Sequence, residues 1–219
     1  MSDTLRKIKN DFNAALSMDP AATNRFEVAL TYAGFHAMLF YRLSHWLVNR
    51  RIPFLPRALS QFARFLTGIE IHPGATIGSG LFIDHGMGVV IGETSEIGNN
   101  VTLFQGVTLG GTGKQRGKRH PTIGSHVVVG AGAKVLGPIT VGDYVKIGAN
   151  SVVLQDVPDH STVVGIPGRI VRIKDERVAD DALMDHIHIP DPIADKLIEL
   201  QVQIDALKNE LEKRKEAGK

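Results

Sequence analysis

Residues 122–153 read TIGSHVVVGAGAKVLGPITVGDYVKIGANSVV, and the fold prediction starts from this segment. An isoleucine or valine returns at every sixth position, and glycine often follows it directly. The residues that carry this pattern are Ile123, Val129, Val135, Val141, Ile147 and Val153. A six-residue period is typical of a parallel β-helix, in which each face of a triangular coil takes six residues and each aliphatic anchor points into the prism. Anchors three periods apart are then expected to stack, about 4.8 Å from coil to coil.

The same pattern extends towards the N-terminus, so the predicted repeat region spans residues 68–173. Its earlier anchors are Ile71, Ile77, Ile83, Ile91, Ile97, Leu103 and Leu109. Of the 23 glycines, 21 lie between Gly68 and Gly168, where they give the backbone the freedom that tight corners require. A β-sandwich would instead show hairpin turns and period-two alternation. The repeat therefore predicts a parallel β-helix over this region.

The two flanking regions differ from the repeat in composition. Residues 1–67 hold seven of the nine phenylalanines and an apolar stripe at helical spacing, which predicts a helical region. Residues 174–219 are highly charged, and a helix of about 192–215 is predicted from heptad-spaced apolar residues, namely Ile193, Leu197, Leu200, Ile204, Leu207 and Leu211. This helix is expected either to form a coiled coil that matches the symmetry of the core or to pack on its own subunit. The fold class is therefore α+β.

Composition excludes several classes of protein. The 25 basic and 23 acidic residues leave a net charge of +2, which gives no general case for a nucleic-acid or membrane-surface protein. The absence of cysteine excludes a disulfide scaffold, a thiolate zinc site and a cysteine nucleophile. Residues 1–10 lack the apolar core of a signal peptide, and no apolar run approaches the ~20 residues of a membrane span. We expect a soluble, cytoplasmic protein.

The repeat is interrupted twice. Ile83 and Ile91 are eight residues apart, and Leu109 and Ile123 are fourteen apart, where six would continue the pattern. The second excess expels an excursion loop, residues 110–121, whose cations are Lys114, Arg116, Lys118 and Arg119. This loop is either a solvated basic loop or a basic flap over an anionic ligand. Chemistry is expected at these interruptions, because a repetitive scaffold carries its functional residues where it deviates.

His85 lies in the first interruption and directly follows Asp84. Because one turn of the coil brings residues near 70 beside residues near 85–88, we predict that Glu70 contacts His85. A carboxylate bonded to one imidazole nitrogen fixes the tautomer and raises the basicity of the other nitrogen, so this pair would activate a hydroxyl group. The alternative is that both side chains are ordinary surface residues.

The region from about residue 19 to residue 171 resembles the serine O-acetyltransferases. The matching stretches are Asp19-Pro20-Ala21, Gly34-Phe35-His36-Ala37, Tyr41-Arg42, His45-Trp46, Glu70-Ile71-His72-Pro73, Ile83-Asp84-His85, Val107-Thr108-Leu109-Gly110-Gly111-Thr112-Gly113-Lys114, Arg119-His120-Pro121 and Gly165-Ile166-Pro167. Hexapeptide repeats alone are shared by many acyltransferases, whereas these motifs together are specific. The resemblance implies a left-handed β-helix. It also implies transfer of an acetyl group from acetyl-CoA to the hydroxyl of L-serine, which gives O-acetyl-L-serine and CoA in cysteine biosynthesis.

The resemblance also implies a role for each site residue. His85 corresponds to the general base that takes the proton of the serine hydroxyl, and Glu70 stands where the family has a dyad carboxylate, often an aspartate. The residues implied to hold the serine ammonium and carboxylate are Asp19, Asp84, Arg119 and His120. The residues implied to contact acetyl-CoA, the co-substrate, are Gly111, Ala131, Lys146 and Ala149. No metal is expected.

Members of this family form trimers with the active site between neighbouring subunits. The helical region is shorter here than in longer members, so a homotrimer is expected, with a dimer of trimers as the alternative. Cysteine, which is shaped like serine, is expected to act as a competitive feedback inhibitor. Residues 216–219 lack the terminal isoleucine with which longer members dock into O-acetylserine sulfhydrylase, so that partnership is doubtful.

Three other functions would account for some features of this sequence. Another hexapeptide O-acetyltransferase, acting on a sugar or an antibiotic, would share the fold, the base and acetyl-CoA, but the paired carboxylates and Arg119 suit a zwitterion better. A γ-type carbonic anhydrase would need a three-histidine zinc site, for which the candidates are His85, His120 and His126. A non-catalytic scaffold would leave the Asp84-His85 and His120 set unexplained.

Overall fold

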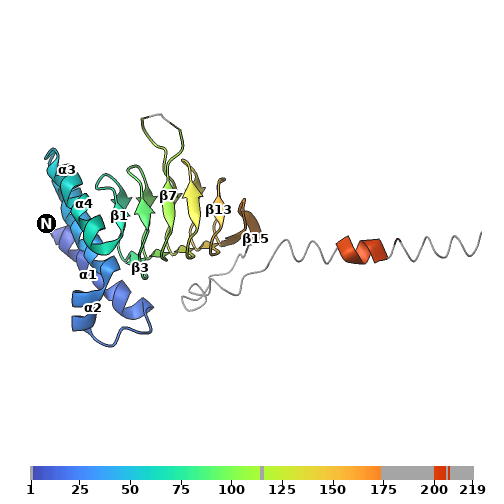
Figure 1. Ribbon diagram of the computed structural model, residues 1–219, viewed down its shortest axis with the longest axis horizontal. Helices are drawn as coiled ribbons and strands as arrows, with labels where there is room; N and C mark the ends of the chain where they lie inside the picture. The colour runs from blue at the N-terminus through green and yellow to red at the C-terminus, as the bar shows by residue number, and fades with distance from the viewer. Residues whose placement is uncertain (1, 114–115, 174–199, 206, 208–219) are drawn as a thin grey trace, which may run out of the picture.

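A computed structural model of the chain describes residues 2–113, 116–173, 200–205 and 207. Helices come first and short strands follow (Figure 1). The helices are α1 (Ser2–Met18), α2 (Arg25–Thr31), α3 (Ala33–Asn49) and α4 (Leu55–Thr67). The strands build an elongated prism, and the helices gather at one end of it (Figure 1). The helical region that was predicted for residues 1–67 is therefore confirmed.

The strands form three sheets, which are the faces of the prism. The first face consists of β1 (Glu70–Ile71), β4 (Val90–Ile91), β7 (Thr108–Gly110), β10 (Lys134–Leu136) and β13 (Val152–Val153). The second face consists of β2 (Thr76–Ile77), β5 (Glu96–Ile97), β8 (Thr122–Ile123) and β11 (Thr140–Val141). The third face consists of β3 (Phe82–Ile83), β6 (Thr102–Leu103), β9 (Val128–Val129), β12 (Lys146–Ile147), β14 (Ser161–Val164) and β15 (Arg169–Ile173). Neighbours pair in parallel, except that β15 runs antiparallel to β14.

The predicted anchors stack inside the prism. Leu109 pairs in register with Ile91 below it and with Val135 above it, and all three side chains are completely buried. Both interruptions leave this register intact, because Ile71 still pairs with Ile91 across the first one and Ile97 pairs with Ile123 across the excursion loop. The extra residues are therefore expelled at corners rather than absorbed into strands. The parallel β-helix is confirmed, and its hexapeptide repeats and parallel sheets fit the left-handed type.

Three corners join the faces, and they locate the functional residues. The third–first corner contains the turns after β3, β6, β9 and β12. The first–second corner contains the turns after β4, β7 and β10, including the excursion loop. The second–third corner contains the turns after β2, β5, β8 and β11.

Helices α3 and α4 close the open end of the prism. The first coil donates its backbone N–H groups to the second coil, so its own carbonyls have no coil beneath them. Side chains from the helices donate to these carbonyls instead: Tyr41 to Ala75 at 2.7 Å, Ser60 to Ile71 at 2.8 Å and Arg42 to Ile77 at 2.8 Å. The helical region thus completes the first coil as well as covering its core.

Two predictions concern parts of the chain away from the prism. The predicted heptad helix lies mostly outside the described residues, although residues 200–205 are helical. Among the residues that the structure describes, no helix is both long and apolar enough to cross a membrane.

Candidate active site

His85 occupies the third–first corner, in the first interruption of the repeat. Its φ of 55° lies in the left-handed region, and the N–H of Gly86 donates to the carbonyl of Asp84 at 2.6 Å across this tight turn. The His85 side chain is 74% exposed, and its Nε2 lies 4.0 Å from Oδ1 of Asp84. The turn therefore presents the imidazole at the surface, next to a carboxylate.

Asp19 joins this corner through Tyr32. Asp19 lies in the turn after α1, and the hydroxyl of Tyr32 donates to its Oδ2 at 2.6 Å. The pKa of Tyr32 is raised to about 12, chiefly by this hydrogen bond and then by burial, with the negative charges of Asp19, Glu27 and Asp84 acting in the same direction. The charges of both carboxylates that were predicted to bind an ammonium group thus raise the pKa of the same phenol.

The predicted contact between Glu70 and His85 is not formed in this structure. The Glu70 carboxylate pairs instead with two arginines of α4: Oε1 lies 3.2 Å from Nη2 of Arg57, and Oε2 lies 3.2 Å from Nη1 of Arg64. Spacing along the coil placed both residues in the right neighbourhood. However, it could not show that α4 lies against β1 and brings two cations to this carboxylate, or that the turn directs the His85 ring outwards.

His120 lies in the first–second corner, where Thr94 fixes its ring. The backbone N–H groups of Arg119 and His120 donate to Oγ1 of Thr94 at 3.0 and 3.1 Å. Nδ1 of His120 accepts from the Thr94 N–H at 3.2 Å and lies 2.9 Å from the Thr94 hydroxyl. With Nδ1 as an acceptor, the hydrogen-bond network assigns the ring proton to Nε2. Burial lowers the pKa of His120, and the charge of Arg119 lowers it further, so the neutral ring is favoured.

The surroundings of His120 explain two glycines and one glutamate in this corner. A side chain at Gly92 would collide with the His120 ring, and one at Gly111 would crowd its Nε2. The Arg119 guanidinium lies 2.5 Å from Oε2 of Glu93, and this hydrogen bond holds the pKa of Glu93 below its ordinary value. Arg119 is therefore oriented by an acidic neighbour one coil below it.

The predicted site residues are divided between two corners of the prism. Asp84 and His85 belong to the third–first corner, and Asp19 is linked to the strand before this corner through Tyr32 and the cluster that contains Phe82. Arg119 and His120 belong to the first–second corner. These corners lie at opposite edges of the first face. One prism alone therefore does not surround a small substrate with both sets.

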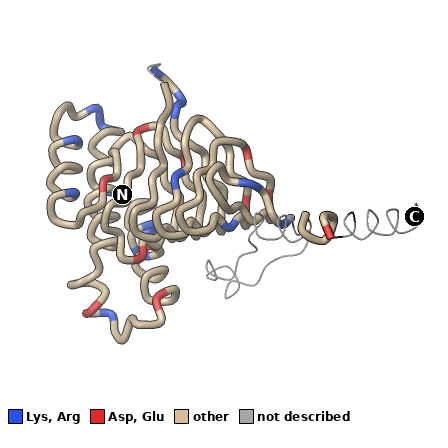
Figure 2. The backbone as a smooth tube through the Cα atoms, turned by 45° about the vertical axis from the view of Figure 1, so that its right-hand side comes forward, with Lys and Arg blue, Asp and Glu red and all other residues tan. Residues whose placement is uncertain are grey.

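The residues expected to contact acetyl-CoA are divided in the same way. Ala131 and Ala149 follow β9 and β12 in the third–first corner, the corner of His85, and the N–H of Asn150 donates to the Ala131 carbonyl at 2.8 Å. Lys146 lies on β12 of the third face. Gly111 instead lies near the start of the excursion loop, beside His120. Figure 2 shows basic residues on this loop where it projects from the prism.

Comparisons with known proteins identify the family. A family model described as bacterial transferase hexapeptide (six repeats) matches residues 120–155. The serine acetyltransferase of Bacillus subtilis strain 168 is 61% identical over 211 residues, which is 96% of each chain. The chain belongs to the serine acetyltransferases. The predicted resemblance is thereby confirmed over almost the whole chain.

Solved serine acetyltransferases share the fold. The Neisseria gonorrhoeae enzyme in complex with serine is 40% identical with a TM-score of 0.76, and the match covers 78% of this chain and 70% of that one. A serine acetyltransferase in complex with cysteine is 43% identical with a TM-score of 0.81 and coverages of 86% and 73%. The Brucella abortus strain S19 enzyme in complex with coenzyme A is 43% identical with a TM-score of 0.74 and coverages of 78% and 68%.

Sequence reasoning missed Tyr32, Glu93 and Thr94. Tyr32 belongs to an apolar helical stripe, which is typical of packing. Glu93 and Thr94 follow the anchor Ile91 and Gly92, in a turn of ordinary length. The available signal for Glu93 and Thr94 was their position one coil below the end of the excursion loop. The pairing of β5 with β8 sets these two turns one above the other.

The three histidines considered for zinc lie apart within one chain. His85, His120 and His126 belong to the third–first, first–second and second–third corners, respectively. In the described ranges, no three His, Asp or Glu side chains are grouped so that they could hold a metal ion.

Proposed function

We propose that this serine acetyltransferase transfers the acetyl group of acetyl-CoA to the hydroxyl of L-serine, with His85 as the general base. The observation that carries the proposal is the exposed His85 imidazole beside Asp84, on a corner to which Asp19 is linked through Tyr32 and the cluster that contains Phe82. These are the two features that the acceptor requires: a base for its hydroxyl and negative charge for its ammonium group.

The reaction balances with His85 as the only proton carrier. The imidazole takes the serine hydroxyl proton as the oxygen attacks the thioester carbonyl, and the C–O bond forms. The tetrahedral intermediate collapses with cleavage of the C–S bond, and the imidazolium returns the proton to the CoA thiolate. The products are O-acetyl-L-serine and CoA. A role of Glu70 in this reaction stays a prediction, because its carboxylate pairs with Arg57 and Arg64.

The two charged groups of serine are proposed to bind to two different sets of residues. Asp19 and Asp84 are proposed to hold the serine ammonium. Arg119 and His120 are proposed to hold its carboxylate, the former through its guanidinium and the latter through its Nε2–H. A neutral His120 suits this role, because Nε2 donates while Nδ1 stays bound to Thr94. This zwitterion-binding set argues against a neutral sugar as the acceptor.

The division of the site between two corners supports a homotrimer. A threefold arrangement with the first faces turned inwards would place the third–first corner of one subunit beside the first–second corner of the next. The active site would then lie between subunits, with acetyl-CoA along the corner that carries Ala131 and Ala149. Cysteine, which retains the ammonium and carboxylate of serine, is proposed to compete at this site, as the solved cysteine complex supports.

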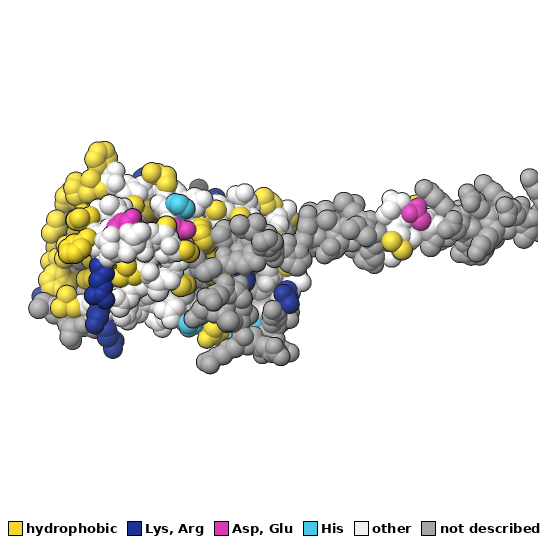
Figure 3. Space-filling model, turned by 90° about the horizontal axis from the view of Figure 1, so that it is seen from below, with side chains coloured by type: hydrophobic (Ala, Val, Ile, Leu, Met, Phe, Trp, Pro, Cys, Tyr) yellow, Lys and Arg dark blue, Asp and Glu magenta, His cyan; other side chains and the backbone are white. Residues whose placement is uncertain are grey.

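A dimer of trimers would use the helical end of the molecule. Figure 3 shows hydrophobic side chains gathered over that end. Phe26, Phe54 and Phe65 are 81%, 86% and 85% exposed, an unusual arrangement for a surface that faces only water. Sedimentation velocity separates a trimer from a hexamer directly.

The first experiment follows thiol release from acetyl-CoA with L-serine, a simple galactoside or buffer as the acceptor. Wild type and His85→Ala are compared under identical conditions. Serine-dependent release that disappears in the variant is expected. Release with the galactoside but not with serine would overturn the assignment of serine as the acceptor. Undiminished release by His85→Ala would overturn the assignment of His85 as the base.

The second experiment tests the shared site. His85→Ala and His120→Ala are expected to be inactive separately, because each lacks one half of the site. Co-expressed, the two variants are expected to regain about one quarter of wild-type activity, since random mixing leaves that share of interfaces with both histidines. No recovery from a mixed trimer of confirmed composition would place both histidines in a site within one chain.

A further inference from the structure

We infer that Tyr32 is a positioning residue that holds the Asp19 carboxylate in place for the ammonium group of the acceptor. This inference rests on the proposed function, in which Asp19 binds the serine ammonium. It adds a residue of the helical region to the site, and it gives the junction between α2 and α3 a role in substrate recognition.

The Asp19 carboxylate is held at both oxygens. Oδ2 accepts from the Tyr32 hydroxyl at 2.6 Å, and Oδ1 accepts from the N–H of Ala21 at 2.8 Å. The Ala21 contact belongs to the turn itself and moves with it. The Tyr32 contact is different, because it ties the turn after α1 to another part of the molecule.

Tyr32 belongs to a hydrophobic cluster that includes the strand before the base. It occupies the C-cap position of α2 and the N-cap position of α3, and it packs against the buried cluster formed by Ala15, Val28 and Phe82. Phe82 belongs to β3, which leads directly into Asp84 and His85. The phenol therefore sets the position of Asp19 relative to the end of β3, where the reacting hydroxyl has to lie.

Charge gives a second reason for a hydrogen-bond donor at this place. Asp19 and Asp84 both act on Tyr32, so two negative groups share one corner before an ammonium group arrives. Like charges repel and favour a carboxylate that turns away. A donated hydrogen bond to an ionised carboxylate opposes that movement without adding a positive charge that would compete with the substrate.

Tyr32→Phe tests this role, with Tyr41→Phe as the matched control. Both changes remove one hydroxyl and keep the ring, but the Tyr41 hydroxyl donates to the buried Ala75 carbonyl rather than to Asp19. Tyr32→Phe is expected to raise the KM for L-serine about 10-fold, with kcat changed less than about twofold and the KM for acetyl-CoA unchanged. Tyr41→Phe is expected to lower the melting temperature and leave both KM values unchanged.

A substrate analogue separates positioning from a general structural effect. 3-Hydroxypropanoate keeps the hydroxyl and carboxylate of serine but lacks the ammonium group. We expect the preference of wild type for serine over this analogue, as a ratio of kcat/KM, to fall about 10-fold in Tyr32→Phe. An equal loss with both acceptors, or an unchanged KM for serine, would overturn the inference. Failure of the proposed function itself would be seen separately, as wild type that does not acetylate serine.

Discussion

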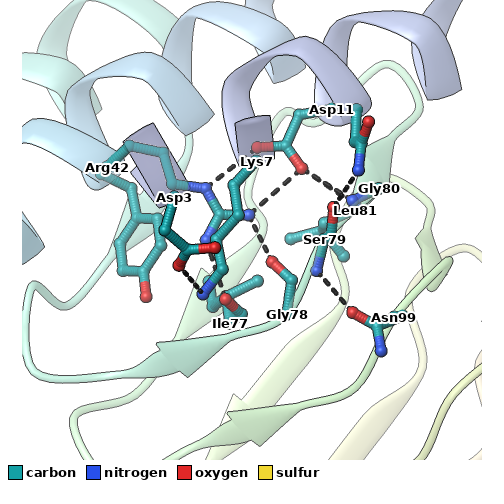
Figure 4. Close-up of polar contacts among 12 residues, drawn as sticks. Asp3, Lys7, Asp11, Arg42, Ile77, Gly78, Ser79, Gly80, Leu81 and Asn99 are labelled. Atoms are coloured by element: carbon teal, nitrogen blue, oxygen red, sulfur yellow. Dashed lines mark hydrogen bonds and ion pairs between the residues drawn. The ribbon is translucent and has the colours of Figure 1, made fainter. Parts of the chain in front are cut away.

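Arg42 on α3 forms a buried ion pair with Asp11 on α1, at 3.0 Å between Nε and Oδ2 (Figure 4). The same guanidinium donates to the carbonyls of Ile77 and Gly78, while Oδ1 of Asp11 accepts from the N–H groups of Gly80 and Leu81. The pair therefore joins two helices to the first coil and satisfies backbone groups at its open end. This contact explains the conspicuous Tyr41-Arg42 motif as a feature of the fold.

Asp11→Ala is expected to lower the free energy of unfolding by about 3–5 kcal/mol, because it leaves the Arg42 charge buried without its partner. Arg6→Ala on the same helix is the control, since the pair of Arg6 with Asp3 lies at the surface and should hardly affect stability. Urea unfolding of the three proteins measures the difference. Equal midpoints for Asp11→Ala and wild type would show that the helices do not stabilise the first coil in this way.

Glu70→Gln separates a catalytic role of this residue from a structural one. If Glu70 assists His85, kcat is expected to fall about 10-fold to 100-fold with little change in the KM for serine. If Glu70 only binds Arg57 and Arg64, the melting temperature should fall while kcat remains. Steady-state kinetics and a thermal melt on one preparation distinguish these outcomes, and an unchanged kcat would remove Glu70 from the mechanism.

Thr94→Val removes the hydroxyl that accepts from two backbone N–H groups and faces Nδ1 of His120. The ring should then lose its fixed orientation, and we expect the KM for serine to rise about 10-fold. Thr94→Ser keeps the hydroxyl and is expected to behave like wild type. If both variants kept the wild-type KM, Thr94 would have no part in carboxylate binding.

Stability is expected to fall as the pH falls from 7.5 to 5.5. Burial lowers the pKa of both His72 and His120 from 6.5, with the charges of Arg57 and Arg119, respectively, adding to the effect. The unfolded chain then binds more protons than the folded chain, so stability begins to decline as the pH drops through 6.5 and continues to decline towards the lower folded pKa values. Melting temperatures across this range measure the slope. His120→Asn should reduce it, and an identical slope in that variant would contradict the assignment to His120.

Local sequence predicted much of this protein because a repeat fold depends on local rules. Anchors such as Ile123 and Val141 return at a fixed period, and a corner that gains residues can expel them without disturbing the stacking of the next coil. The same rules placed chemistry at His85 and at the end of the excursion loop. The short apolar stripes before residue 68 were sufficient to predict helices, but they gave no sign that Arg42 and Tyr41 complete the first coil.

The sequence by itself determined the β-helix, the helical region before it and the residue types at the candidate site. Tertiary structure decided which of these residues meet. Glu70 pairs with Arg57 and Arg64 because α4 lies against β1. Tyr32 reaches Asp19 from the junction of α2 and α3, which packs on a cluster that includes Phe82. His85 and His120 lie at different corners because the first face of the triangular coil separates them. Such contacts depend on how separate elements dock. Docking is set by packing over whole surfaces, which no local period in the sequence encodes.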